Sequence, residues 1–241
     1  MGQSTSKVTY KKDKYTYNEA TDWPYVWALR DGSVLDWRVG LSDDEILARQ
    51  TQQADLPTAI TPTLYLGNCQ SAHDLEKLQR LGIRRVLNMA GPSATPLAIV
   101  EAYAKHGITY NVMNAQDEED YPLLDMHWEE AHAFINAGLE HKLKVLVHCV
   151  AGHNRSSLIV ASQHLLMSSS NTVLDTIRHI RLQRGNVALH NEGFQEQLVA
   201  FARVHDRAGA PPTSACPPPS SSKRPSRREH PLHKLSTFEF T

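Results

Sequence analysis

The sequence predicts an α/β fold in which a central, largely parallel sheet is flanked by helices. Short apolar runs alternate along the chain with segments whose apolar residues recur at helical spacing, a pattern typical of parallel sheets covered by helices. The run KVLV at 144–147 is apolar apart from its lysine, so it is the expected central strand. A chain of 241 residues with 41% apolar content can bury one sizeable core.

Local signals mark the individual elements. Ser42 and Glu45 form a capping box at the start of a helix, and acidic residues fill its first turn, where the helix dipole favours them. Gly82 ends a helix with leucines at helical spacing, and Asn171 is the expected N-cap of a later helix. The predicted elements are helix 42–53, strand 63–67, helix 71–82, strand 84–90, helix 96–107, strand 108–113, helix 123–140, strand 144–147, helix 156–166, a helix after Asn171, and helix 191–204.

Two of these helices show clear burial patterns. Segment 156–166 is apolar nearly all round, so we expect it to be buried. In 123–140 the residues expected on one buried face are Leu124, Trp128, Ala131, Ile135 and Gly138.

Composition divides the chain into three parts. Residues 55–207 form the α/β unit, preceded by an N-terminal extension, 1–54, and followed by a tail, 208–241. The extension carries tryptophans at 23, 27 and 37, which we expect to cap one side of the α/β unit rather than to lie at a membrane interface or bind a partner. The tail is rich in proline, serine and basic residues, a composition that cannot bury a core and predicts disorder.

Charge and cysteine content exclude several classes of protein. A net charge of −1 gives no basic footprint, so extended nucleic-acid binding is not expected. Three cysteines, at 69, 149 and 216, indicate free thiols in a reducing compartment. The histidines do not fall in paired ligand spacings, so we predict no metal site and no other cofactor. Without a membrane-spanning run or a signal-peptide segment, the protein is expected to be cytoplasmic, either soluble or anchored.

The first residues, MGQSTSK, predict a lipid anchor. Gly2 followed by Ser6 fits the myristoylation pattern. One myristoyl chain binds membranes only marginally, and each nearby lysine adds on the order of 1 kcal/mol at an anionic surface. The lysines are Lys7, Lys11, Lys12 and Lys14. Together these features predict peripheral attachment to the cytoplasmic face of a membrane; the alternative is an unmodified, flexible end.

The stretch HCVAGHNRSS, 148–157, lies between the expected central strand and a buried helix. Ligands of open α/β sheets bind beyond the carboxyl ends of strands, and a helix N-terminus offers free N–H groups and a positive dipole. A turn between Cys149 and Arg155, permitted by Gly152, would direct amides at a tetrahedral oxyanion that the guanidinium also grips. The same field favours the thiolate of Cys149. The same loop is therefore expected to hold a nucleophile and a binding site for an anion.

At these residues the chain resembles the protein-tyrosine phosphatase superfamily, and its compact size resembles the dual-specificity branch. The match includes His148, Cys149, the Arg155 that follows after five residues, and Ser156, with the strand before and the helix after. Segments ITPTLYLGN, LGIRRVLNMA and NEGFQEQL are also similar, so the resemblance covers about 57–204. It implies the phosphatase fold for this α/β unit, with phosphate-binding positions Val150, Ala151, Gly152, His153, Asn154 and Arg155.

The resemblance implies a mechanism in two steps. Cys149 attacks phosphorus, Arg155 and the loop amides hold the oxygens, and a cysteinyl-phosphate forms. Asp117, at the family's spacing before the cysteine, protonates the leaving oxygen, and Asp120 is the rival acid. Ser156 donates to the departing thiolate when the intermediate hydrolyses.

Further roles follow from the same resemblance. His148 orients and electrostatically supports the cysteine from behind. Asn191 braces the phosphate loop, although His190 replaces the proline that usually precedes it. Apart from the resemblance, we expect Cys69 to be a buried small side chain and Cys216 a thiol of the tail. The alternative for Cys69 is a resolving disulfide with Cys149, because thiolates of low pKa oxidise easily.

The expected substrates are phosphorylated proteins, with phosphotyrosine and phosphoserine or phosphothreonine both accepted at a shallow site. The variable loop positions contain no lysine, which disfavours a phosphoinositide phosphatase. Asn154 before Arg155 resembles RNA 5′-triphosphatases, an alternative that the neutral net charge and the retained Asp117 disfavour. A membrane-tethered module that binds phosphoproteins with little turnover remains the alternative from a different class.

Overall fold

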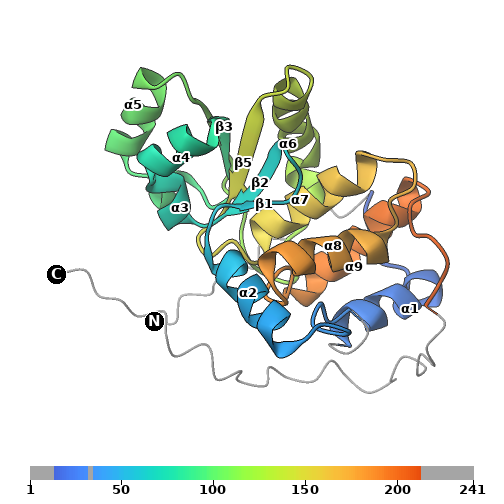
Figure 1. Cartoon of the computed structure of the whole chain (residues 1–241). Coiled ribbons are helices and arrows are strands. Elements are labelled where there is room, and N and C mark those ends of the chain that lie inside the picture. The colour runs from blue at the N-terminus through green and yellow to red at the C-terminus, as the bar shows by residue number, and fades with distance from the viewer. Residues whose placement is uncertain (1–13, 32–34, 213–241) are drawn as a thin grey trace, which may run out of the picture.

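The computed structural model describes residues 14–31 and 35–212 (Figure 1). The expected anchor at Gly2, Lys7, Lys11 and Lys12, and most of the expected tail, lie outside these residues. The helices are α1 (Glu19–Arg30), α2 (Asp43–Ala54), α3 (Cys69–His73), α4 (Leu75–Leu81), α5 (Leu97–Lys105), α6 (Leu123–Leu139), α7 (Arg155–Leu166), α8 (Val173–Arg184) and α9 (Glu192–Val204), with a short 3₁₀ helix at Pro92–Ala94. The strands are β1 (Thr58–Ala59), β2 (Leu64–Gly67), β3 (Ile83–Asn88), β4 (Thr109–Val112) and β5 (Lys144–His148).

The sheet has the order β1-β2-β5-β3-β4. β1 pairs antiparallel with β2, and the other pairings are parallel. The prediction of a largely parallel sheet with 144–147 at its centre is therefore confirmed. Helices α3, α4 and α5 lie on one side of this sheet, and α6 to α9 lie on the other (Figure 1).

The central strands are apolar on both faces because both faces are covered. Along β5, Val145 and Val147 join the larger core beneath α6 to α9, while Leu146 joins the smaller core beneath α3 to α5. Along β2, Leu66 and Tyr65 divide between the same two cores. This alternation is the period of two along a strand, which places successive side chains on opposite faces. It explains why these strands are continuous apolar runs in the sequence.

The two expected burial patterns are confirmed. The predicted face of α6, from Leu124 to Gly138, is buried at all its expected positions. Helix α7 is buried on almost every side, from Ser156 to Leu165.

Two expected helix boundaries are wrong. The predicted helix 71–82 is broken at Asp74, whose side chain accepts from the N–H of Lys77 (2.9 Å) and so starts α4 as a new helix. Thr172, not Asn171, is the N-cap of α8. Asn171 instead donates its side-chain amide to the carbonyl of His164 (2.7 Å), which ties it to the end of α7.

The N-terminal extension packs on the α/β unit, as expected from its aromatic residues. Val26 and Leu29 of α1 are buried in the larger core, which they share with α8 and α9. Polar contacts reinforce this packing. Arg203 of α9 pairs with Asp22 (2.9 Å), and Arg181 of α8 donates to the carbonyl of Leu29 (2.9 Å).

Leu29→Ala is expected to lower the free energy of unfolding by about 3 kcal/mol, because it removes a side chain that is 1% exposed and leaves a cavity. Leu47→Ala, at a leucine of α2 that is 64% exposed, is the matched control and should change the free energy by less than about 0.5 kcal/mol. Urea unfolding of the full chain measures both. Equal, small effects would contradict the packing of α1 into the core.

Candidate active site

Residues 149–154 join the end of β5 to the start of α7. β5 ends at His148, where the parallel neighbours β2 and β3 also end, in register at Gly67 and Asn88. The carboxyl ends of these strands therefore meet at this loop, where open α/β sheets bind ligands. We call residues 149–155 the phosphate loop. Helix α7 begins at Arg155, so its N-terminus adds free N–H groups and a positive dipole.

The carbonyl oxygens of the phosphate loop are held from outside. The pairs are Cys69 N to Val150 O (3.1 Å), Arg184 Nη2 to Ala151 O (3.2 Å) and Leu189 N to His153 O (2.7 Å). Backbone amides from 150 to 154 have no acceptor among the described residues. The C=O and N–H of one peptide group point in opposite directions, so the N–H groups that follow these three outward carbonyls face the interior of the loop. Such a ring of amides is an anion-binding nest.

Gly152 allows this backbone path for two reasons. Its φ is +67°, a left-handed conformation that other residues adopt at a cost. A Cβ at this position would also lie 2.5 Å from the carbonyl oxygen of Gly67, a backbone atom that cannot move aside. The loop therefore packs directly against the end of β2.

Cys149 lies at the base of the phosphate loop. It is 1% exposed, and the hydroxyl of Ser156 in the first turn of α7 donates to its sulfur (3.2 Å). A hydroxyl donor and a helix N-terminus both stabilise negative charge on sulfur. The structure thus brings Cys149 and Ser156 together.

His148 lies directly behind the cysteine and is fully buried. Burial lowers its pKa to about 4, so the ring is neutral at neutral pH. Its Nδ1 lies 3.3 Å from the carbonyl of Cys149 and therefore carries the proton of that hydrogen bond. The expected electrostatic support by His148 is consequently not that of a positive charge: the ring acts as a neutral donor that orients the backbone.

Arg155 joins the phosphate loop to the loop between β4 and α6. Its Nη1 donates to the carbonyl of Ala115 (3.2 Å), and its Nε lies 3.7 Å from Oδ2 of Asp117. Asp117 is thereby placed at the phosphate loop. Asp120 is exposed and makes no hydrogen bond or ion pair with the described residues of this loop. Of the two candidate acids, only Asp117 has contacts with described residues of the phosphate loop.

Asn191 has a different arrangement from the expected one. Its Oδ1 caps α9 by accepting from the N–H of Phe194 (3.1 Å), and its Nδ2 donates to Oδ1 of Asp117 (3.1 Å). Only its backbone N–H reaches the phosphate loop, where it donates to Oδ1 of Asn154 (3.0 Å). Asn191 therefore supports that loop through its backbone and supports Asp117 through its side chain.

Helix α9 also holds the loop that follows Asp117. A Cβ on Gly193 would lie 1.7 Å from the carbonyl oxygen of Glu119, so the two backbones are in direct contact. Gln197 donates to the carbonyl of Tyr121 (2.8 Å) and accepts from the N–H of Leu124 (3.1 Å). One helix therefore positions the segment carrying the candidate acid.

Comparison with known proteins identifies the family to which this chain belongs. Residues 64–204, more than half of the chain, match the family described as dual specificity phosphatase, catalytic domain. The chain belongs to this family. The matched residues include the phosphate loop, Asp117 and Asn191.

Dual-specificity phosphatases also appear among its relatives. The chain is 33% identical over 176 residues to the human protein phosphatase Slingshot homolog 3, covering 73% of this chain and 25% of that protein. It is 36% identical over 149 residues to human dual specificity protein phosphatase 26, covering 60% of this chain and 66% of that protein. The crystal structure of DUSP15 aligns with a TM-score of 0.51 and 26% identity, over 62% of this chain and 95% of that one.

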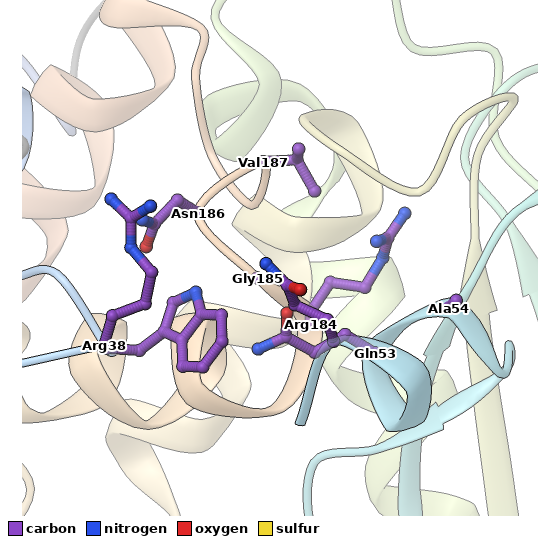
Figure 2. A pocket seen from close by; sticks show the side chains of 9 residues that line it. Arg38, Gln53, Ala54, Arg184, Gly185, Asn186 and Val187 are labelled. Atoms are coloured by element: carbon purple, nitrogen blue, oxygen red, sulfur yellow. The ribbon is translucent and has the colours of Figure 1, made fainter. Parts of the chain in front are cut away.

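Sequence reasoning missed Arg184, which lies at the end of α8. Its side chain is buried and donates to the phosphate loop at Ala151. Burial lowers its pKa, while the nearby Cys149 opposes that shift. Arg184 lines a cavity of about 340 Å³, together with residues of α2 such as Gln53 (Figure 2). Gln53 donates to the carbonyl of Leu182 (3.0 Å). A side chain of α2 therefore supplies a hydrogen-bond donor to a carbonyl in the last turn of α8, the helix that carries Arg184.

The remaining predicted features have these outcomes in the structure. Cys69 donates its backbone N–H to the phosphate loop, and its disulfide with Cys149 stays a prediction. Within 14–31 and 35–212, no group of His, Cys, Asp or Glu is arranged to hold a metal ion. Over the same residues, no helix is long and apolar enough to cross a membrane.

Gly152→Ala is expected to reduce vanadate affinity at least about tenfold, because the new Cβ forces the phosphate loop away from β2. Gly107→Ala is the matched control, since Gly107 has a φ of +66° but a Cβ added there would meet no atom within 4 Å. It should cost about 1 kcal/mol of stability and leave vanadate binding intact. Calorimetric titration and thermal unfolding separate the two effects. Undiminished binding by Gly152→Ala would contradict the proposed nest.

Proposed function

We propose that this chain is a cysteine-dependent phosphatase that hydrolyses phosphotyrosine and phosphoserine or phosphothreonine in proteins. The chain spans 25% of the Slingshot relative and 66% of dual specificity protein phosphatase 26, so the activity is inferred from its own site. One observation carries the proposal. The Cys149 sulfur accepts a hydrogen bond from Ser156 beneath a ring of inward amides, with Asp117 held at the rim.

In the first step the thiolate of Cys149 attacks phosphorus. The P–O bond to the leaving group breaks as the S–P bond forms, and Asp117 gives its proton to the departing oxygen. The loop amides and the guanidinium of Arg155 stabilise the charge on the three equatorial oxygens. Arg155 can do this by exchanging its long 3.7 Å contact with Asp117 for a bidentate contact with phosphate.

In the second step water attacks the phosphorus of the cysteinyl-phosphate. The deprotonated Asp117 accepts the proton of the water, and the S–P bond breaks to release inorganic phosphate. Ser156, 3.2 Å from the sulfur, donates to the thiolate as it leaves. The same carboxyl group therefore acts as acid and then as base.

The rim of the phosphate loop favours protein substrates. It has no lysine at its variable positions, and Val150 is an apolar residue that is 50% exposed. Burial, and then the nearby Arg184 and His190, lower the pKa of His153, which favours the neutral form of this side chain. A rim with few cations suits a single phosphoryl group better than the multiply charged phosphoinositides or RNA 5′-triphosphates.

Replacing Cys149 by Ser should lower kcat for phosphotyrosine and phosphothreonine peptides at least about 10³-fold. Asp117→Ala should lower it about 10²- to 10⁴-fold. Asp120→Ala, the neighbouring exposed carboxylate, is the control and should stay within about twofold. Released phosphate is measured on a panel that includes phosphoinositides and a 5′-triphosphorylated RNA.

The outcomes of this panel separate the alternatives. A clear preference for the lipid or the RNA would replace the proposed substrate class. Equal, negligible rates for wild type and Cys149→Ser, with retained binding of phosphopeptide, would indicate the membrane-tethered binding module.

We further propose that the protein is attached to the cytoplasmic face of a membrane through a myristoylated Gly2 and its lysines. The motif MGQSTSK and the basic residues that follow support this proposal. Lys14 contributes less than expected, because its ammonium group pairs with Glu129 of α6 (3.1 Å).

Gly2→Ala is expected to move most of the protein from the membrane fraction to the soluble fraction, because the acyl chain supplies most of the binding free energy. Cell fractionation and labelling with a myristate analogue measure this. Lys14→Ala serves as the control and should shift the distribution only slightly. Equal membrane recovery of wild type and Gly2→Ala would overturn the proposed anchor.

A further inference from the structure

Asn154 occupies the N-cap position of α7 but does not cap it. An asparagine at this position usually accepts a hydrogen bond from an N–H in the first turn of its own helix. No such bond is present here. Its Oδ1 instead accepts from the backbone N–H groups of His190 (2.9 Å) and Asn191 (3.0 Å), which precede α9. The first N–H groups of α7 are thereby kept clear for an anion in the phosphate loop.

These two donors also determine the orientation of the Asn154 amide. Turning the amide over would place its NH₂ group against two N–H donors, so the oxygen must face His190 and Asn191. The NH₂ group then points the opposite way. It donates to Oδ2 of Asp117 at 3.3 Å.

The other oxygen of Asp117 is also held by an asparagine whose amide orientation is fixed by a backbone donor. Asn191 donates its Nδ2 to Oδ1 of Asp117 (3.1 Å), and its own Oδ1 accepts from the N–H of Phe194 (3.1 Å). Each asparagine is thus oriented by backbone donors at the start of α9. Both carboxylate oxygens meet an amide whose direction is settled by the fold.

We propose that Asn154 is a positioning residue for the general acid: it holds Asp117 over the phosphate loop, an inference that rests on the acid role proposed for Asp117 above. Arg155 lies 3.7 Å from Oδ2, the same oxygen that Asn154 contacts. When the guanidinium turns to a bound phosphate, this contact is lost. Asn154 and Asn191 then keep the carboxyl group in place for proton transfer.

The proposal is tested with two aryl phosphates that differ in their need for an acid. Phenyl phosphate has a poor leaving group and depends on protonation, whereas p-nitrophenyl phosphate depends on it much less. Asn154→Asp removes the donor to Asp117, keeps an acceptor for His190 and Asn191 and places a like charge beside Asp117, whereas Asn154→Ala removes the donor and the acceptor without adding charge. Both should lower kcat on phenyl phosphate at least about fivefold more than kcat on p-nitrophenyl phosphate.

Two readouts distinguish positioning from a general effect on structure. In an Asp117→Asn background, the effect of Asn154→Ala should nearly vanish, because there is no acid left to position. The alkaline limb of the rate profile on phenyl phosphate, which reports the protonated acid, should flatten in Asn154→Asp as it does in Asp117→Asn.

A matched control is Asn171→Asp, at an asparagine whose side-chain amide also donates one hydrogen bond but to His164 at the end of α7. It should change both substrates equally or not at all. Equal losses on the two phosphates in Asn154→Ala, additive with Asp117→Asn, would overturn the positioning role while leaving the proposed function intact. If instead Asp117→Asn turns over phenyl phosphate as fast as wild type, the acid role of Asp117 fails and the positioning role fails with it.

Discussion

The site depends on the hydrogen bonds that hold the phosphate loop from outside. Donors from the segment after β2, from the end of α8 and from the segment before α9 each take one carbonyl oxygen of this loop. A short loop with its carbonyls engaged outward can only turn its amides inward. The anion site is thus a property of the surrounding framework as much as of the loop's own residues, and the buried Arg184 is part of that framework.

Helix α9 connects the two halves of the site. The first turn of this helix and the two residues before it supply the backbone donors that orient both asparagines in contact with Asp117. The backbone of α9 also touches the segment after this carboxylate at Gly193. The same helix also packs against α1, with Arg203 paired to Asp22 and Arg30 paired to Glu196. The N-terminal extension therefore contributes to the stability of the helix that positions the candidate acid.

Much of this arrangement could be predicted from the sequence, because it rests on local signals. The apolar run at 144–147 and the helical spacing in 123–140 predict the central strand and α6 correctly, and the motif from His148 to Ser156 predicts where the nucleophile lies. Contacts between distant segments carry no such signal. Nothing around Arg184 indicates that it reaches the phosphate loop, and the broken helix at Asp74 depends on one side-chain cap. Helix α1 contains Pro24, which disfavours a helix locally, and its packing against α9 overrides that preference.

Full burial fixes the protonation state of His148, which lies beside the reactive cysteine. With a pKa of about 4, this ring keeps the same protonation state from mildly acidic to alkaline solution. The ring that contacts the backbone of Cys149 therefore adds no change of charge to the site over this range. An ionisation seen in the kinetics near neutrality would therefore not belong to this imidazole.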